Sequence, residues 1–306
     1  MIKKIIVTGA TGLIGRKLCS KLLEQGNEIT IFTRNPEAAK KVMRGAKKYV
    51  KWNYNNPEEW KDYLNETDSV IHLAGTNIGA KRWNNKFKKE LFNSRIESTR
   101  QLVNIIKNCE NKPKSFITAS AVGFYGDRAD EVLIEKSNTG KDFLSNLCSE
   151  WEKEAEKIED QNVRRVSLRI GLVLNNEGGV LKKFLPPFKI FLGGPLGNGK
   201  QWFPWIHIED LINILIHTIK TESLQGPVNI ASPGIVRMND FATSLGKVLQ
   251  RPSFFQVPKF ILKIAVGEFA DAIISGQKVS VDKLLNSGYN FRFTDLEKAL
   301  KNLLEK

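Results

Sequence analysis

The chain has 306 residues, a hydrophobic content of 41% and a formal net charge of +14. Such a chain can bury a large core, which predicts one big α/β domain, or one with an appendage, and excludes general disorder. No run approaches the roughly 18 apolar residues of a membrane span. The first residues enter a strand pattern directly instead of a signal peptide. We expect a cytoplasmic protein without membrane partners.

The charge and the cysteines exclude further classes. The basic residues are scattered along the chain, often as pairs such as Lys40–Lys41 and Lys182–Lys183. Positive potential attracts nucleic acids and acidic membranes, but no nucleic-acid-binding motif accompanies it, so we favour a generally basic surface. Nucleic acid is the weakest alternative. The three cysteines lack CxxC spacing, which argues against a disulfide framework or a zinc site.

Short apolar runs alternate with helix-sized segments through the first half of the chain. The expected strands are residues 5–7, 29–32, 49–52, 69–73, 116–119 and 166–169. Such alternation predicts a Rossmann-type α/β fold, in which right-handed crossovers wind a parallel sheet on both faces.

The alternation ends after residue 169. The expected features there are a Gly/Pro-rich stretch at 193–199, an aromatic segment at 205–208, a helix near 211–219, a strand near 228–230 and a mostly helical tail from residue 238. We predict a Rossmann domain over residues 1–172, to which the segment 205–231 returns. A smaller, mostly helical C-terminal domain over 173–306 is expected on the substrate side. Because open α/β sheets bind ligands at their carboxyl edges, we expect a small-molecule substrate in the interdomain cleft.

A glycine-rich turn follows the first expected strand. It reads Thr8-Gly-Ala-Thr-Gly-Leu-Ile-Gly15 and leads into a helical pattern. Glycines at this spacing permit a tight turn, let the backbone approach a pyrophosphate and let the helix pack on the strand. The candidate contacts are Gly9, Thr11, Gly12, Leu13, Ile14 and Gly15. The turn therefore predicts a dinucleotide cofactor.

The end of the second strand indicates which dinucleotide. An NAD site usually offers an acidic residue there for the ribose 2′-hydroxyl. This chain instead has Thr33, Arg34 and Asn35. A guanidinium pairs well with a 2′-phosphate. We predict NADP(H) over NAD(H), with Arg34 on the phosphate; the alternative is an ordinary solvated arginine.

Several motifs together resemble a known family. The motif Thr8–Gly15, His72-Leu-Ala-Gly75, Tyr125-Gly126 and Arg169-Ile-Gly171 resemble the extended short-chain dehydrogenase/reductase superfamily. Arg82-Trp83, Ser94-Arg95 with Thr99, the segment 201–208 (QWFPWIHI) and the tail from Gly276 to Tyr289 resemble its atypical branch, the epimerase family. Members of that branch are labelled YfcH-like or SulA-like sugar-nucleotide epimerases and carry a C-terminal domain of unknown function. The resemblance covers almost the whole chain.

The resemblance implies further cofactor contacts. Beyond the glycine turn, Thr33 and Arg34, these are Leu73, Ala74 and Gly75 beside the adenosine and ribose, and Val173 after the sixth strand. The helix that contains Glu90 and Arg95 is expected to run past the cofactor. Arg95 replaces an asparagine common in the superfamily, and a cation there suits the pyrophosphate; a solvated helix face is the alternative for both residues.

The superfamily's catalytic pair is missing. Its tyrosine is a general acid/base whose pKa is lowered by a lysine four residues later. Aligning the helices places Cys148 and Glu152 at these positions. A carboxylate beside a thiol raises the thiol pKa, and helical spacing predicts that Cys148 faces inward as a small apolar side chain.

Two residues remain as catalytic candidates. Ser120 is a candidate substrate hydrogen-bond donor, although the family's Ser/Thr position falls on Ala121. Tyr125 is a candidate pocket residue or substitute acid, with a pKa expected near 10 without the lysine.

The remaining aromatic and histidine residues have open or structural interpretations. Arg82, Trp83, Trp202 and Trp205 border the expected cleft and either stack on substrate or join the domains. We expect His72 and His207 to make structural hydrogen bonds. No metal is expected, because no cluster has metal-ligand spacing.

The leading interpretation is an NADP(H)-dependent oxidoreductase or epimerase-like enzyme of the atypical branch, acting on an unidentified small molecule such as a nucleotide sugar. The alternative is a non-catalytic NADP(H)-sensing regulatory or scaffold protein; the label SulA-like suggests a link to division by name alone.

Overall fold

The computed structural model describes residues 2–305. Seven strands form one parallel sheet in the order β11-β7-β5-β4-β1-β2-β3. The strands are β1 (Lys4–Thr8), β2 (Glu28–Thr33), β3 (Lys48–Lys51), β4 (Ser69–His72), β5 (Ser115–Ala121), β7 (Arg164–Ile170) and β11 (Gly226–Ile230). The Rossmann prediction is confirmed. The strand order reverses between β1 and β4, which makes their carboxyl ends the switch point where such sheets bind ligands.

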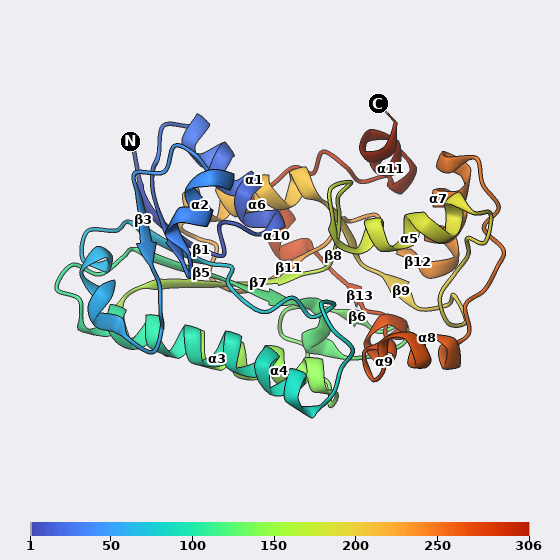
Figure 1. The fold of residues 1–306 in the computed structure, drawn as a ribbon, viewed down its shortest axis with the longest axis horizontal. Coiled ribbons are helices and arrows are strands. Elements are labelled where there is room, and N and C mark those ends of the chain that lie inside the picture. The colour runs from blue at the N-terminus through green and yellow to red at the C-terminus, as the bar shows by residue number, and fades with distance from the viewer. Residues whose placement is uncertain (1, 306) are drawn as a thin grey trace.

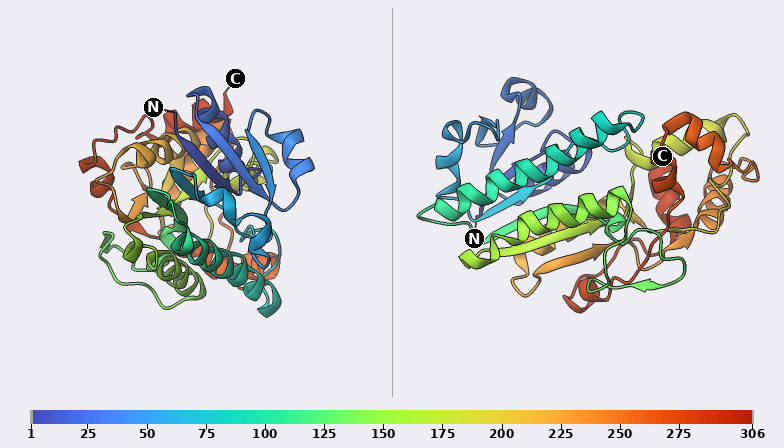
Figure 2. Two further views of the ribbon diagram at one scale, coloured as in Figure 1. Left: turned by 90° about the vertical axis from the view of Figure 1, so that its left-hand side faces the viewer. Right: turned by 90° about the horizontal axis from the view of Figure 1, so that it is seen from below.

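Helices cover both faces of the sheet (Figure 1). On one face α1 (Leu13–Glu24) packs against α6 (Ile208–Lys220), with α2 (Pro36–Val42) beside β2 and β3. On the other face α3 (Asn85–Asn108) and α4 (Phe143–Glu156) lie side by side, as Figure 2 shows from below. Because both faces are covered, the inner strands β4, β5 and β7 are buried along almost their whole length, polar positions included.

Most of the remaining elements gather beyond the carboxyl edge of the sheet, whereas α10 (Asp282–Asn286) packs against β11 (Figure 1). The helices are α5 (Gly179–Lys189), α7 (Met238–Leu249), α8 (Lys259–Val266), α9 (Phe269–Ile274), α10 (Asp282–Asn286) and α11 (Leu296–Leu304). Short strands pair as β8 (Leu172–Leu174) with β10 (Trp205–His207), β9 (Trp202–Phe203) with β12 (Val236–Arg237), and β6 (Val132–Leu133) with β13 (Lys278–Val279). Single 3-10 turns are η1 (Pro57–Glu59), η2 (Lys61–Leu64), η3 (Val122–Tyr125) and η4 (Glu159–Gln161).

The chain returns to the sheet after this excursion. Helix α6 packs on α1, and β11 pairs with β7 at the sheet edge. The domain limits at residues 172 and 173 stay a prediction.

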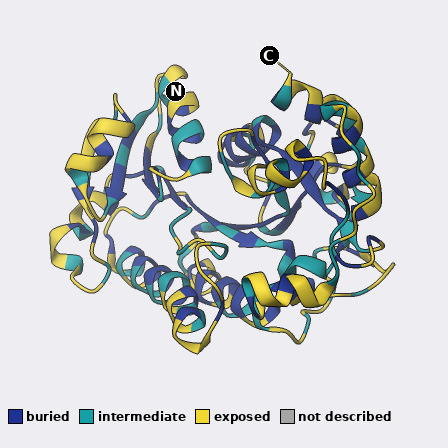
Figure 3. Cartoon of the chain, turned by 45° about the vertical axis from the view of Figure 1, so that its right-hand side comes forward, coloured by how far each residue is buried: buried dark blue, intermediate teal, exposed yellow. Residues whose placement is uncertain are grey.

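The core is continuous from the sheet into the C-terminal elements. Buried residues follow the strands and the inward faces of the helices, while exposed positions lie on the outer turns (Figure 3). Aromatic stacking extends it: the Phe203 and Phe241 rings of β9 and α7 stack with centroids 4.1 Å apart. Within residues 2–305, no helix combines the length and apolarity that crossing a bilayer requires.

Candidate functional site

The glycine turn after β1 is packed so closely against the rest of the chain that two of its glycines leave no room for a side chain. Gly9 has φ of 71°, and a Cβ there would lie 2.8 Å from the Leu73 carbonyl carbon. The Gly12 amide donates to the Gly9 carbonyl at 3.0 Å, which closes the turn. A Cβ on Gly15 would collide with the Gly9 carbonyl oxygen. Glycine is therefore required at Gly9 and Gly15 for the turn to close and to pack against the segment after β4.

The start of α1 suits an anion. Gly12 is the N-cap and offers no side-chain acceptor, and no acidic residue stands in the first turn. The first amides of a helix lack intrahelical acceptors and carry the positive end of its dipole, so those of Leu13 and Ile14 face a pyrophosphate well. Thr11 is exposed at the turn. The residues present therefore fit a dinucleotide diphosphate.

The loop after β2 presents Arg34 to solvent. Arg34 is exposed, whereas its neighbours fix the backbone. The Asn35 amide donates to Thr33 Oγ1 at 3.3 Å, and Asn35 Oδ1 caps α2 by accepting from the Ala38 amide at 3.0 Å. The guanidinium therefore stands on a rigid loop at the end of β2, where an adenosine ribose would lie.

The ends of β1 and β4 are tied together through His72. Thr8 Oγ1 lies 2.7 Å from His72 Nδ1 and accepts from the Ala74 amide at 3.2 Å. Ser98 Oγ lies 3.2 Å from His72 Nε2, so both ring nitrogens have partners. Burial lowers the pKa of His72 to about 3. The ring is neutral and structural, and it holds the segment Leu73–Gly75 next to the glycine turn.

Arg95 lies against this segment from α3. Its Cζ would be 3.1 Å from a Cβ on Gly75, its guanidinium lies 5.3 Å from the Trp151 ring, and Nη1 donates to the Leu91 carbonyl at 3.2 Å. Within residues 2–305, no carboxylate lies within 4.0 Å of it. Burial lowers the pKa of Arg95. A half-buried cation without a counter-charge therefore stands at the switch point.

Glu90 and Val173 have less distinctive surroundings. Glu90 is exposed, and its carboxylate accepts from Lys81 Nζ at 3.1 Å and from Thr76 Oγ1 at 3.5 Å. Val173 is half-buried in β8 and pairs with Ile206 of β10.

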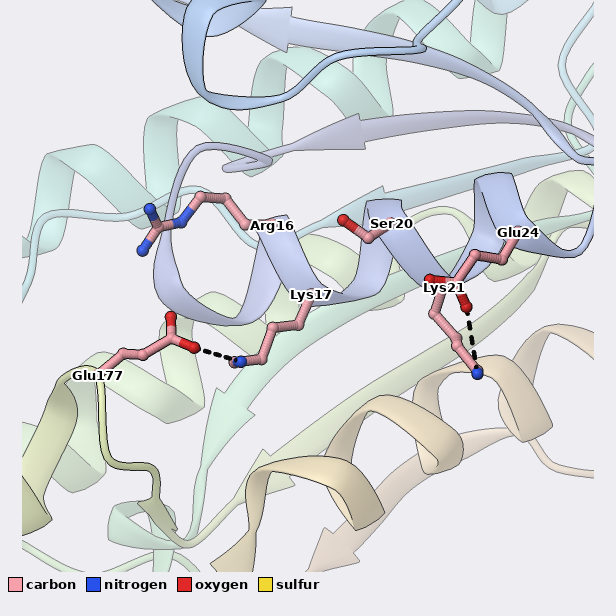
Figure 4. Close-up of a pocket in the computed structure, with 6 residues that line it drawn as sticks. All are labelled: Arg16, Lys17, Ser20, Lys21, Glu24 and Glu177. Carbon is pink, nitrogen blue, oxygen red and sulfur yellow. Dashed lines mark hydrogen bonds and ion pairs between the residues drawn. The ribbon is translucent and has the colours of Figure 1, made fainter. Parts of the chain in front are cut away.

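The loop after β8 is fastened to α1. Figure 4 shows a hollow beside α1, and its lining residues are Arg16, Lys17, Ser20, Lys21, Glu24 and Glu177. Lys17 Nζ pairs with the Glu177 carboxylate at 2.6 Å, and a Cβ on Gly178 would lie 3.5 Å from the Leu13 side chain. This hollow lies on the outer side of α1, so its role is to flank the glycine turn rather than to form part of it.

A buried ionic network occupies the region of the missing pair. Arg169 of β7 holds the Glu152 carboxylate with two hydrogen bonds, Nε to Oε1 at 2.9 Å and Nη2 to Oε2 at 2.8 Å. Ser120 Oγ donates to Glu152 Oε1 at 2.6 Å. All three residues are buried. Glu152 therefore stands as the counter-charge of Arg169 and bonds α4 to β5 and β7.

Tyr125 belongs to the same network. Its hydroxyl donates to Asn229 Oδ1 at 2.6 Å and accepts from Arg169 Nη1 at 2.8 Å. Burial raises the pKa of Tyr125 to about 12, although Arg169 acts in the opposite direction. The structure thus brings Ser120 and Tyr125 together through Arg169, with both hydroxyls engaged in internal hydrogen bonds.

Cys148 lies on the inward face of α4. Burial, and then the charge of Glu152, raise the pKa of the thiol to about 12. A protonated, buried thiol is not a nucleophile at neutral pH. One turn nearer the N-terminus of α4, the Leu144 side chain would lie 3.5 Å from a Cβ on Gly123, so apolar atoms line this face.

The aromatic residues divide into packing and accessible ones. Trp83 is buried and stacks on Phe269 with centroids 4.9 Å apart, and Trp205 is fully buried. Trp202 is half-buried; its Nε1 donates to Asp130 at 2.8 Å, and the Arg237 guanidinium lies 4.5 Å from its ring. Of these three, Trp202 is the one with a face toward solvent.

The other polar candidates are structural or exposed. His207 is fully buried, and its Nδ1 accepts from the Glu209 amide at 3.1 Å, which caps α6. Arg82 is exposed beside Gly267. Over residues 2–305, no group of three or more His, Cys, Asp or Glu side chains is arranged for a metal ion.

Sequence reasoning missed the partnership of Glu152 and Arg169. The available signal was an arginine within an apolar strand and a glutamate on the inward face of a helix. Charges at such positions are buried, and buried charges are paired.

Comparison with known proteins places the chain in a family. Residues 5–231 match the model of the NAD dependent epimerase/dehydratase family, and residues 257–303 match a domain of unknown function, DUF1731. The Epimerase family protein SDR39U1 homolog, chloroplastic, of Arabidopsis thaliana is 38% identical over 98% of this chain and 86% of its own length. Epimerase family protein YfhF of Bacillus subtilis is 36% identical over 98% of this chain and 97% of its own.

The fold of this chain matches that of a solved structure over almost its whole length. The crystal structure of human epimerase family protein SDR39U1 (isoform 2) with NADPH superposes with a TM-score of 0.89 at 33% identity, covering 99% of both chains. The chain belongs to the NAD-dependent epimerase/dehydratase family, in the epimerase-family branch that carries the C-terminal DUF1731 domain.

Proposed function

We propose that this protein binds NADP(H) and is an oxidoreductase of the epimerase type, acting on a small molecule in the cleft beyond the sheet's carboxyl edge. The observation that carries the proposal is the tight glycine turn at the switch point, which leads into a start of α1 without a side-chain cap, together with the exposed Arg34 at the end of β2. The human relative crystallised with NADPH supports it.

Each predicted cofactor contact has a role in this proposal. The turn contributes backbone amides and close approach through Gly9, Thr11, Gly12, Leu13, Ile14 and Gly15. Thr33 and Arg34 hold the 2′-phosphate, and Leu73, Ala74 and Gly75 border the adenosine side. Arg95 neutralises the diphosphate, because it is a half-buried cation at Gly75. Glu90 and Val173 lie at the rim of the cofactor site.

The bound coenzyme supplies hydride transfer. Ser120 and Tyr125 remain the candidates for contact with substrate, and Ser120 must then exchange its bond to Glu152 for one to the substrate. Tyr125 acts as a wall of the site rather than an acid, since burial raises its pKa to about 12. Without a positioned acid, the proton comes from water or from the substrate, and the rate is lowered by about 10²- to 10⁴-fold relative to an enzyme with one.

A second candidate function is NADP(H) sensing without turnover. The engagement of both hydroxyls in the buried network favours it, because a group whose hydrogen bonds are satisfied internally is not poised for proton transfer.

Coenzyme consumption separates the two functions. Purified protein is mixed with NADPH and then with aldehydes, quinones and sugar nucleotides, while fluorescence reports binding and absorbance reports oxidation. Consumption that falls at least tenfold in Ser120→Ala, and is unchanged in Ser20→Ala on the exposed face of α1, supports the enzyme. Because an epimerase regenerates its coenzyme, the sensor is supported when coenzyme binds but is not consumed and no sugar nucleotide is converted to its epimer. Absence of binding contradicts both.

A further inference from the structure

Two segments of the C-terminal part carry only positive charge. Residues 178–208 and 241–267 contain no Asp or Glu. Their eight basic residues are Lys182, Lys183, Lys189, Lys200, Lys247, Arg251, Lys259 and Lys263. In a chain that holds 33 acidic residues, this one-sided composition sets the two segments apart.

The two segments lie side by side. The Phe255 amide donates to the Gly193 carbonyl at 3.1 Å, and the Val257 amide donates to the Pro195 carbonyl at 2.9 Å. The Arg251 guanidinium lies 4.6 Å from the Phe191 ring. The segments therefore present one shared surface.

That surface is unusually apolar. Its exposed side chains, with exposed fractions, are Ile190 65%, Phe191 54%, Leu192 51%, Phe254 74%, Phe255 42%, Phe260 64%, Ile261 45% and Ile264 71%. Single exposed hydrophobic residues are normal, but a concentration of them marks an interaction site. We call these eight residues the apolar surface.

Helix α8 contributes an amphipathic edge to the apolar surface, at the end of the molecule away from β3 (Figure 1). Phe260, Ile261 and Ile264 point outward, while Leu262 is buried. Lys259 and Lys263 flank them and share Asp271 of α9, at 2.7 Å and 3.6 Å.

The tip after α5 holds a strained residue. Phe191 has φ of 64°, a left-handed conformation that costs a non-glycine residue on the order of 1 kcal/mol. Its amide donates to the Phe188 carbonyl at 3.0 Å, and the Leu192 amide donates to the Pro187 carbonyl at 2.9 Å. These bonds hold three consecutive apolar side chains outward.

The charge pattern indicates what this surface contacts. Lys247 pairs with Glu297, and Lys259 and Lys263 pair with Asp271. Over residues 2–305, Lys189, which precedes Ile190, and Arg251, whose guanidinium lies over Phe191, have no carboxylate within 4.0 Å. Apolar side chains flanked by Lys and Arg are typical of insertion among anionic headgroups.

We propose that the apolar surface docks this protein on an anionic lipid bilayer. The aromatic and aliphatic side chains enter the headgroup boundary, and Lys189 and Arg251 bind lipid phosphates. The contact is peripheral, so it requires no spanning helix. It departs from the sequence-based expectation of no membrane partner and is independent of the proposed coenzyme chemistry.

Co-sedimentation of the full chain with vesicles tests the proposal. Phosphatidylcholine vesicles are compared with vesicles that also contain phosphatidylglycerol. We expect binding to the anionic vesicles that weakens with salt. The exposed double variant Phe260→Ser/Ile264→Ser should weaken it about tenfold or more, because the buried apolar area is lost. Lys189→Ser should weaken it about fivefold, since one lysine contributes roughly 1 kcal/mol near an anionic surface.

The control is Val42→Ser, which changes an apolar residue that is 53% exposed on α2, away from the apolar surface; this variant should bind as the unmodified chain does. Equal sedimentation with neutral and anionic vesicles, or no loss in the double variant, overturns the proposal. The proposal is likewise overturned if analytical ultracentrifugation without lipid shows a dimer of the unmodified chain and a monomer of the double variant. The apolar surface would then be an interface between copies. The proposal is also overturned if an acidic protein binds this chain through Phe260 and Ile264 and anionic vesicles do not compete with that binding.

Discussion

At the scale of single residues, the proposed preference for NADPH rests on Arg34. Its position after β2 follows from the strand, and its exposure follows from the Thr33 and Asn35 bonds that fix the loop. The sequence predicted this placement because both signals, the strand end and the charge, are local. By contrast, the partners of Ser120 and Tyr125 lie 32 and 104 residues away, a separation on which local patterns carry no information.

Replacing Arg34 should remove the preference for NADPH. The ion pair with the 2′-phosphate contributes about 1.5–3 kcal/mol, so Arg34→Ala should reduce the ratio of NADPH to NADH affinity by roughly 10- to 150-fold. The matched control is Arg44→Ala, which removes another exposed arginine. Arg44 follows α2, the helix that runs back from the carboxyl end of β2 to the start of β3, so it lies at the amino edge of the sheet, away from Arg34. Fluorescence titration with both coenzymes measures the ratio, and an unchanged ratio in Arg34→Ala rejects the assignment.

Because His72 is buried in its neutral form, the free energy of unfolding should decrease at acidic pH. The pKa of His72 is lowered by burial to about 3, whereas the unfolded value is 6.5. Between these values the unfolded chain binds a proton that the folded chain does not, so the free energy of unfolding should fall as pH drops below about 6.5, by up to ~1.4 kcal/mol per pH unit. Urea unfolding from pH 7 to pH 4 measures the slope. His72→Asn should flatten it, and an equal slope in that variant would show that other groups dominate.

At the scale of elements, the buried network replaces the missing catalytic pair with a structural joint. Glu152 joins α4 to the ends of β5 and β7, and Tyr125 extends the joint to Asn229 on β11. The helices and strands themselves were predictable from periodicity: each of the seven expected strands overlaps a strand of the sheet. The strands β6, β8, β9, β12 and β13 were not, because two or three residues show no periodicity.

Breaking this joint should be far more costly than breaking a surface pair. Glu152→Gln leaves the Arg169 guanidinium buried without its counter-charge, which should lower the free energy of unfolding by about 3–5 kcal/mol. Glu150→Gln on the same helix removes an exposed pair with Lys153 and should cost at most about 1 kcal/mol. Chemical unfolding of both variants makes the comparison. Equal losses would mean that Glu152 and Arg169 are not coupled in the folded protein.

At the scale of the whole molecule, the sheet and the C-terminal elements meet at the switch point. The family and fold were predictable because the glycine turn, the strand alternation and the tail motif are local patterns that together span most of the chain. The apolar surface was not, because it joins residues 190–192 to residues 254–264 through backbone bonds that only the structure shows.

Coenzyme binding should stabilise the whole fold. A ligand at about 100 times its dissociation constant adds roughly 2.7 kcal/mol to the free energy of unfolding when it binds only the folded state. NADPH should therefore raise the Tm of the full chain, and NADH should raise it less. Thermal denaturation with each coenzyme measures the difference between the two increases in Tm. Arg44→Ala should keep this difference, and Arg34→Ala should lose it.

Isothermal titration calorimetry of the unmodified chain with NADPH and then NADH is the most direct test of the central claim. The account predicts saturable uptake of one NADPH per chain, with NADH bound more weakly. Titrations in which neither coenzyme produces heat of binding, at concentrations where the chain is folded, would contradict it.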